Sequence, residues 1–198
     1  MRTILLDAGH GGMIGGQYQT DGKKWTLRDG TTIHEGEFNR AIKARVMERL
    51  YSANIPYIDI NPEQLDVPRW ERVKRANKAH RQCKQQTLLL SIHANIGGGK
   101  GTGFEVFTSK KAGKTSRLFA SICKQEFDDF FPQEVNRGIK RKNFDLVYKT
   151  KGPAALLELF FMDREREARK YIIDPKGRDY LADYIVACIQ CFLNTIPA

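Results

Sequence analysis

The chain has 198 residues, enough for one domain with a substantial hydrophobic core and too few for two domains of ordinary size. Hydrophobic residues make up 41% and charged residues 28% of the chain, which excludes a disordered or fibrous protein. The net charge of +10 predicts an anionic partner, such as nucleic acid, a membrane surface or an acidic wall polymer. No apolar run approaches the roughly 18 residues of a membrane span, and the start MRTILLDAGHGG lacks the apolar stretch of a signal peptide. We therefore expect a protein that is made in the cytoplasm, unless a leader precedes this sequence.

Short apolar runs alternate with helical patterns along the chain. Strands are predicted at residues 3–7, 56–60, 87–92, 103–108, 145–148 and 154–161. Helices are predicted from apolar residues that recur every three or four positions within residues 38–50, 69–83, 116–131 and 180–193. This alternation predicts a single three-layer α/β domain, with helices on both sides of a mainly parallel, mixed sheet of about six strands.

Four cysteines are scattered through segments that read as helices. Cys188 and Cys191 form a C-x-x-C pair, but both lie in the apolar pattern YLADYIVACIQCFL. We expect them to be reduced core residues; the alternative is a structural zinc site or a disulfide.

Three side chains that can bind a metal or transfer a proton lie in strands or at strand ends. His10 follows the first strand in the turn DAGHGG, and His93 ends the third strand in LLLSIHAN. Glu158 lies within the apolar strand LLELFFMD, where a carboxylate must be paired, bound to a metal or shifted toward its neutral form. Ligands of such folds bind at the carboxyl ends of strands, so the three could be neighbours.

Catalytic zinc requires about three nitrogen or oxygen ligands and one open position. The third ligand is expected in HEGEFN, where Glu35 and Glu37 stand at the start of a predicted helix. Either acid could instead simply compensate the helix dipole. His34 and His80 are expected to be a loop residue and a helix-face residue without a role as ligands.

The segments DAGHGG, EGEFN, RVKRAN, SIHAN, GFEVF, NRGIK and PAALLELFFMD together resemble the zinc-dependent N-acetylmuramoyl-L-alanine amidases of the amidase-3 family. The resemblance extends from Ile4 to the last helix. It implies that His10, Glu35 and His93 bind Zn²⁺ and that Glu158 is the catalytic acid–base residue. Glu35 is preferred to Glu37 because it stands four residues before Asn39, although the long insert before Glu35 departs from the family pattern and leaves this choice open.

The resemblance implies a hydrolase that cleaves the amide bond between N-acetylmuramic acid and L-alanine in peptidoglycan, with residues 1–198 as one catalytic domain and no separate wall-binding module. A structural ion pair is the alternative role for Glu158. Anionic wall polymers are further expected partners, nucleic acid is not, and a monomer is expected. Without a leader, the enzyme would reach the wall by release through a membrane lesion, as a phage endolysin does; a bacterial amidase domain would look the same.

Three further segments have open interpretations. Residues 13–34 contain a hairpin predicted to turn at Asp29 and Gly30. It either forms a lid or wall of the substrate groove, with Trp25 in contact with substrate, or is a surface hairpin without a role in binding. The glycine-rich residues 96–105 lack the spacing of a phosphate-binding loop and are expected to form a mobile rim of the cleft. The basic cluster at residues 137–142 either binds carboxylates of a peptide stem or is a solvated loop.

Two rival functions remain at this point. One is a zinc peptidase or amidase that uses the same residues on a different peptide. The other is a non-catalytic binding protein for wall polymer or nucleic acid, whose binding would weaken with salt and ignore chelators.

Overall fold

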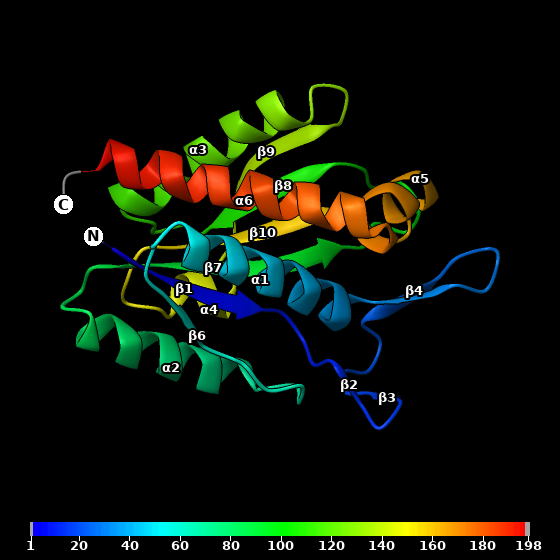
Figure 1. Ribbon diagram of the computed structural model, residues 1–198, viewed down its shortest axis with the longest axis horizontal. Coiled ribbons are helices and arrows are strands. Elements are labelled where there is room, and N and C mark those ends of the chain that lie inside the picture. Colours follow the sequence, from blue (N-terminus) through cyan, green and yellow to red (C-terminus); the bar gives the residue numbers. More distant parts are fainter. Residues whose placement is uncertain (1, 197–198) are drawn as a thin grey trace.

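In the computed structural model, which describes residues 2–196, a six-stranded sheet lies between two layers of helices (Figure 1). The strands in spatial order are β6 (Tyr57–Asp59), β1 (Thr3–Ala8), β7 (Thr87–Asn95), β10 (Ala154–Phe161), β8 (Phe104–Thr108) and β9 (Asn136–Arg141). The first four are parallel, and β10 pairs with β8 in antiparallel fashion. β9 runs parallel to β8. The predicted α/β domain with a mixed, mainly parallel sheet is therefore confirmed.

Three long helices cover one face of the sheet and two shorter ones the other (Figure 1). The first layer consists of α1 (Glu35–Ser52), α3 (Lys114–Phe130) and α6 (Pro175–Thr195), and the second of α2 (Arg69–Gln82) and α4 (Asp145–Tyr148). A short α5 (Glu165–Glu167) and a π-helical segment η1 (Ala168–Ile173) lead into α6. The predicted helices at residues 38–50, 69–83, 116–131 and 180–193 correspond to α1, α2, α3 and α6.

The apolar residues that recur periodically in the sequence form the hydrophobic core. On α1, the residues Phe38, Ile42, Val46 and Leu50, spaced four apart, are all buried against the sheet. Each such side chain stabilises the fold by roughly 1.5–3 kcal/mol through removal of apolar surface from water. At the start of α6, Asp174 accepts a hydrogen bond from the Lys176 amide, which caps the helix.

Two elements differ from the prediction. Residues 145–148 form the helix α4 rather than a strand. Four residues are too few to distinguish a strand from a helical turn, and Leu146 and Val147, neighbours in sequence, are both buried. No strand was predicted at residues 136–141, which form the edge strand β9, whose alternate residues are exposed. Charged residues and a bulge at Gly138 (φ 74°) are typical of an edge strand that must not pair further.

The helix-α2 face of the sheet becomes polar toward the carboxyl ends of its strands. In β7, Leu89 belongs to the apolar core under α2, but Ser91 and His93, two and four positions later, point to the same side. In β10, Leu156 and Glu158 repeat this change from apolar to polar. Because alternate side chains of a strand point to the same face, the polar residues of β7 and β10 lie together at the carboxyl ends of these strands.

The segment between β1 and α1 forms two hairpins at this same end. β2 (Met13–Ile14) pairs with β3 (Gln17–Tyr18), and β4 (Lys24–Thr26) pairs with β5 (Thr32–His34). The second hairpin turns at Asp29 and Gly30 as predicted: Asp29 Oδ1 accepts from the Thr31 amide, and Gly30 has a φ of 87°.

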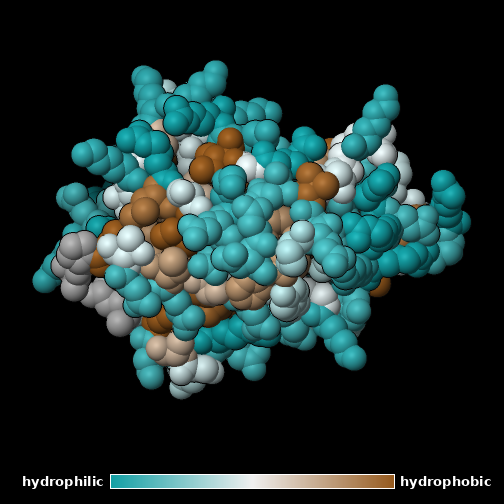
Figure 2. All heavy atoms as spheres, turned by 90° about the horizontal axis from the view of Figure 1, so that it is seen from above, coloured by the Kyte–Doolittle hydropathy of each residue, from teal (hydrophilic) through white to brown (hydrophobic). Residues whose placement is uncertain are grey.

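The surface is mainly hydrophilic. In Figure 2, polar side chains cover most of the visible face, and apolar atoms appear only in limited groups between them. Among residues 2–196, no helix is long and apolar enough to cross a bilayer.

A buried carboxylate holds the turn before β9 to the segment before α6. Glu134 accepts hydrogen bonds from Tyr171 Oη (2.8 Å), from Lys170 and from both terminal nitrogens of Arg166. Burial raises the pKa of the Glu134 carboxyl, but these hydrogen bonds outweigh it, so the pKa lies below the ordinary value of 4.5.

We expect Glu134→Gln to lower the free energy of unfolding at neutral pH, because the carboxylate loses its charged partners. A group with a lowered pKa in the folded state stabilises the fold above its ordinary pKa, and this contribution disappears as the pH falls through the lowered value. The difference between wild type and variant in urea unfolding should therefore be full at pH 7 and shrink below about 4.5. A difference that stays constant down to pH 3 would contradict this account.

Candidate functional site

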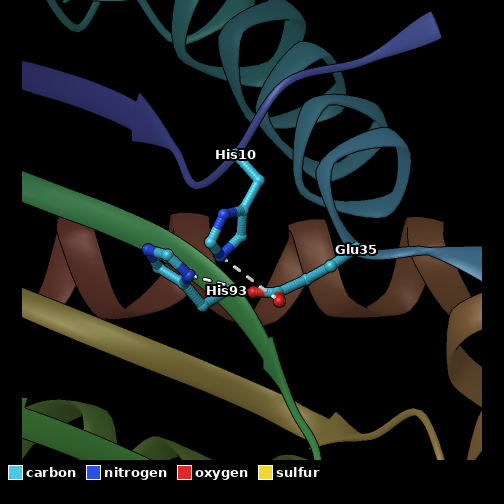
Figure 3. A group of neighbouring side chains, drawn as sticks. All are labelled: His10, Glu35 and His93. Carbon is cyan, nitrogen blue, oxygen red and sulfur yellow. Dashed lines mark hydrogen bonds and ion pairs between the residues drawn. The ribbon is translucent and has the colours of Figure 1, made fainter. Parts of the chain in front are cut away.

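Three side chains from separate elements point toward one another at the carboxyl ends of the strands (Figure 3). His10 lies in the turn after β1, Glu35 is the first residue of α1, and His93 lies near the end of β7. One carboxylate oxygen of Glu35 lies 3.3 Å from His10 Nε2, and the other lies 3.0 Å from His93 Nδ1. One donor atom from each residue can be chosen so that all three lie within 4.8 Å of one another. The structure thus brings together the three residues that the sequence singled out.

The turn that carries His10 is held in a costly backbone conformation. His10 has a φ of 67°, in the left-handed region that side chains with a Cβ rarely adopt. Two residues of α1 hold the turn in place: Asn39 donates to the Gly9 carbonyl (3.0 Å), and Arg40 donates to the His10 carbonyl. Helix α1 therefore supplies both Glu35 and the groups that aim His10 at it.

Gly9 allows the turn to lie against the imidazole of His93. A Cβ at position 9 would lie 2.0 Å from His93 Cε1, far inside any allowed contact. The close approach at Gly36, where a Cβ would lie 1.7 Å from the Gly11 carbonyl oxygen, packs α1 against the same turn. The glycines of DAGHGG and EGEFN thus serve close packing around the site.

Glu35 and His93 stabilise each other's charged forms. Burial disfavours the ionised form of Glu35, but the hydrogen bonds and charges of His10 and His93 outweigh it and hold its pKa well below the ordinary range. Burial likewise disfavours the cation of His93, but the Glu35 carboxylate outweighs it and raises the pKa of His93. Glu35 is therefore an anion at neutral pH.

Glu158 lies beside this group on the neighbouring strand. It is directly opposite His93 in the pairing of β10 with β7. Among residues 2–196, its Oε2 atom is buried without a hydrogen-bond partner, and it forms no ion pair, so the structure gives no support to a structural ion pair. Burial raises the pKa of Glu158 to about 7, with the attraction of His93 acting against it and the repulsion of Glu35 adding to it. Glu158 can therefore hold or release a proton near neutral pH.

A buried ion pair supports the site from below. Asp7 in β1 is fully buried; it accepts from Arg72 of α2 (2.9 Å) and from Ser91 of β7. It thereby ties two strands to α2 directly under His93. Removing one partner of such a pair leaves an uncompensated buried charge, at a cost of about 3–5 kcal/mol.

The other residues that could bind a metal by their chemistry have contacts elsewhere. Glu37 lies away from the group and accepts a hydrogen bond from the Met13 amide (2.9 Å). His34 packs against Tyr18 with ring centroids 4.5 Å apart, and His80 is bonded to Thr87 Oγ1 (2.7 Å). The four cysteines, including Cys188 and Cys191, are free thiols.

The site opens into two connected hollows. A cavity of about 230 Å³ is lined by the group and by apolar residues such as Phe144, Leu146 and Leu156. A wider groove of about 660 Å³ adjoins it; His10, Lys23, Arg69 and Arg72 line both. Trp70, 64% exposed, lines the outer groove.

Lys23, Arg69 and Trp70 were not singled out from the sequence. Trp70 lies in the first turn of α2 and is exposed, although the periodic apolar residues of this helix were expected to be buried. Trp25, the residue considered for the groove, does not line it, although Thr20, Asp21 and Lys23 from the same segment do.

Hydrogen bonds attach the glycine-rich rim to the segment that follows β10. Asp163 accepts hydrogen bonds from the amides of Gly97 (3.0 Å) and Gly99 (2.7 Å). Glu167, fully buried, accepts from the Gly103 amide (2.9 Å) and from Thr102. These contacts attach the rim at both ends, and its mobility stays a prediction. Of the basic cluster, Arg137 lies 3.3 Å from buried Glu105, which is opposite Glu158 in the pairing of β8 with β10.

The chemistry of the three side chains suits a metal ion. Two imidazole nitrogens and one carboxylate oxygen are a common ligand set for catalytic zinc, with one position left for water or substrate. The buried, unpartnered oxygen of Glu158 lies on the adjacent strand, where a group bound at that position would meet it. The residues present thus fit a zinc ion.

The variant Gly9→Ala is expected to displace the His93 ring, because the added methyl group would overlap it. The affinity for Zn²⁺, measured by calorimetry, should fall about 10–100-fold, as when groups that orient a ligand are removed. The control is Gly113→Ala, whose added methyl group would meet no atom within 4 Å. Equal zinc affinity in the two variants would show that the Gly9–His93 contact does not position a ligand.

The sequence of this chain matches a known protein family. The model of the family described as Amidase_3, N-acetylmuramoyl-L-alanine amidase, matches residues 4–191. The chain is 27% identical over 194 residues to the uncharacterized protein YqiI of Bacillus subtilis, covering 98% of this chain and 85% of that protein. It is 28% identical to the N-acetylmuramoyl-L-alanine amidase CwlM of Bacillus licheniformis, where the match covers 86% of this chain and 60% of that protein.

The fold is also found in solved structures. The crystal structure of N-acetylmuramoyl-L-alanine amidase from Clostridium difficile 630 superimposes with a TM-score of 0.83 at 24% identity, covering 99% of this chain and 98% of that one. The family match covers nearly the whole chain and includes the three grouped side chains and Glu158. The chain belongs to the Amidase_3 family of N-acetylmuramoyl-L-alanine amidases.

Proposed function

We propose that this protein is a zinc-dependent hydrolase of the amide bond between N-acetylmuramic acid and L-alanine in peptidoglycan. The observation that carries the proposal is the convergence of His10, Glu35 and His93, with Glu158 opposite His93 on the next strand. The family match supports the same reaction. In this proposal the enzyme acts on the cell wall.

His10, Glu35 and His93 would hold the zinc ion. When bound there, zinc polarises the scissile carbonyl and lowers the pKa of water at its open position from about 16 toward 7. Asp7, Asn39 and Arg40 keep the elements that carry these side chains in register, so little reorganisation is needed when substrate enters.

Glu158 would move the proton. Its carboxyl, whose pKa is raised by burial in the metal-free protein, would accept a proton from the attacking water and deliver it to the leaving nitrogen. The apolar residues around it, including Leu156 and Phe144 of the cavity wall, exclude bulk water from this carboxyl. Such transfer typically contributes a factor of about 10²–10⁴ in rate.

The outer groove would bind the substrate on one side of the scissile bond. Lys23 and Arg69 stand where the groove meets the cavity and offer cations to carboxylates of the peptide stem. Asp21 and Asp66 give the groove anionic groups as well, which suits a peptide that carries both charges. Trp70 offers an exposed flat surface for packing.

Replacing Glu158 with Gln should lower the rate of peptidoglycan cleavage about 10²–10⁴-fold without loss of zinc. The measurement is digestion of purified peptidoglycan, with products identified by mass spectrometry, for wild type, wild type with chelator and E158Q. Wild type should release stem peptides with a free L-alanine amine, and chelator should stop the reaction. Cleavage at another amide would instead support a different zinc peptidase, and salt-sensitive binding without cleavage would support a non-catalytic protein.

The two neighbouring acids at the start of α1 can be separated by matched substitutions. Glu35→Gln should abolish stoichiometric zinc binding, because it removes the anionic oxygen between the two imidazoles. Glu37→Gln should retain zinc, because Glu37 lies outside the group of three. Within residues 2–196, its side chain accepts a hydrogen bond only from the Met13 amide. Atomic absorption after dialysis measures both. Loss of zinc in the second variant but not the first would reverse the assignment.

The two tryptophans provide a further matched pair. Trp70→Ala should raise KM for soluble muropeptides several-fold while leaving kcat nearly unchanged, because it removes contact area distant from the reacting atoms. Trp25→Ala, on the β4–β5 hairpin outside the groove, should change neither. Equal effects of the two variants in steady-state kinetics would exclude the groove as the binding surface.

A further inference from the structure

Acidic residues are almost missing from a long stretch of this chain. Between Glu71 and Glu126, Glu105 is the only one, and it is buried beside Arg137. Lysine and arginine recur throughout the same stretch. The net charge of +10 is therefore concentrated rather than spread evenly.

Seven of these cations, with three more from residues 141–151, lie on elements at the end of the molecule away from the candidate site, on the left of Figure 1. The end is formed by the last turns of α2, the turn between β8 and α3, the end of β9 and the loop between α4 and β10. We call it the basic end and define it by ten exposed residues: Lys78, Arg81, Lys84, Lys110, Lys111, Lys114, Arg117, Arg141, Lys142 and Lys151.

Hydrogen bonds join these segments in two pairs. Asn77 of α2 accepts from the Lys151 amide (2.7 Å), which fixes the α4–β10 loop to α2. Asn143, just after β9, accepts from the Lys110 amide (3.0 Å), which fixes the β8–α3 turn. The backbone at Lys110 and Lys151 is thus held to a neighbouring element.

The fold itself does not compensate these charges. Within residues 2–196, none of the ten forms an ion pair, whereas Arg45, Arg49, Arg166 and Arg169 elsewhere are all paired with carboxylates. Helix α3 even begins with Lys114 and Arg117 near its first turn and has no acidic residue there. The helix dipole disfavours cations at that end, so the arrangement costs stability in the free protein and would be relieved by an anion.

We propose that the basic end binds a linear polyanion with a phosphodiester backbone and polyol units, of the kind that lies among peptidoglycan strands. The choice of this polymer over nucleic acid rests on the proposed function, which places the substrate in the wall. Exposed lysines act as point charges that follow a flexible chain of phosphates, and release of counterions makes such binding favourable at low salt.

The basic end can be occupied while the cleft works. Strand β7 runs from Thr87 near the basic end to His93 at the candidate site. Six residues at about 3.3 Å each separate the two by about 20 Å. A polymer held at the basic end would thus keep the enzyme at the wall without covering the scissile bond.

The test uses fluorescently labelled poly(glycerol phosphate), which contains no amide bond, with the full protein across a salt series. The test variant is Lys110→Gln/Lys111→Gln/Lys114→Gln. The matched control is Lys24→Gln/Arg164→Gln/Lys176→Gln, three exposed cations without ion pairs near β4, α5 and the start of α6. Both variants lower the net charge by the same amount.

Wild type should bind with an affinity that falls steeply with salt, the test variant should bind about tenfold more weakly or worse, and the control should change less than threefold. Thermal stability of the test variant should be unchanged or higher, since the fold loses unfavourable charges. Cleavage of a soluble muropeptide should be the same in all three proteins, so failure of binding is distinguishable from failure of the proposed reaction. Equal weakening by both variants, no binding at low salt, or tighter binding of duplex DNA or anionic vesicles than of poly(glycerol phosphate) would each overturn the proposal.

Discussion

The alternation of side chains along two neighbouring parallel strands is the constraint on which this site depends. Each strand is apolar where it crosses the core under α2 and polar where it ends, as in Leu89, Ser91 and His93 of β7. Because β10 is in register with β7, Glu158 stands opposite His93. A slip of one residue in either strand would turn its side chain to the other face, into the core under α1, α3 and α6. The packing of the core therefore fixes the positions of His93 and Glu158 relative to each other.

The remaining residues of the site are placed by the joint between β1 and α1. The turn after β1 tolerates a left-handed His10 because Asn39 and Arg40 of α1 bind its carbonyl groups, and Gly9 makes room for the His93 ring. The strain at His10 costs on the order of 1–3 kcal/mol, which the surrounding hydrogen bonds must offset. The same helix that supplies Glu35 thus holds the imidazole that Glu35 faces.

Much of this could be predicted from the sequence, because the signals were local. Apolar runs with alternating helical patterns predicted the sheet and four of the helices, and the rule that ligands bind at strand ends brought His10, His93 and Glu158 together. The errors occurred where a segment was too short to assign or where a strand lacked the apolar residues that usually indicate one. DLVY is too short to separate a helical turn from a strand, and the edge strand NRGIKR is charged because it must repel further strands.

Other features depend on contacts between distant segments and have no local signal. Glu35 lies beside the two imidazoles, whereas Glu37 accepts a hydrogen bond from the Met13 amide, 24 residues away in the sequence. The rim at Gly97 and Gly99 is fixed by Asp163, more than sixty residues away. The groove brings Arg69 and Trp70 of the first turn of α2 together with Thr20, Asp21 and Lys23, about fifty residues earlier in the chain. Family resemblance indicated the reaction, but the groove beside the candidate site becomes visible only in three dimensions.

Zinc K-edge X-ray absorption on the purified protein would test the central claim most directly. The account predicts one zinc ion per chain with only nitrogen and oxygen neighbours and the multiple-scattering pattern of two imidazoles, from His10 and His93, beside the Glu35 carboxylate. Sulfur neighbours at about 2.3 Å would place the metal at the cysteines instead. That result, or a protein that binds no zinc, would contradict the account.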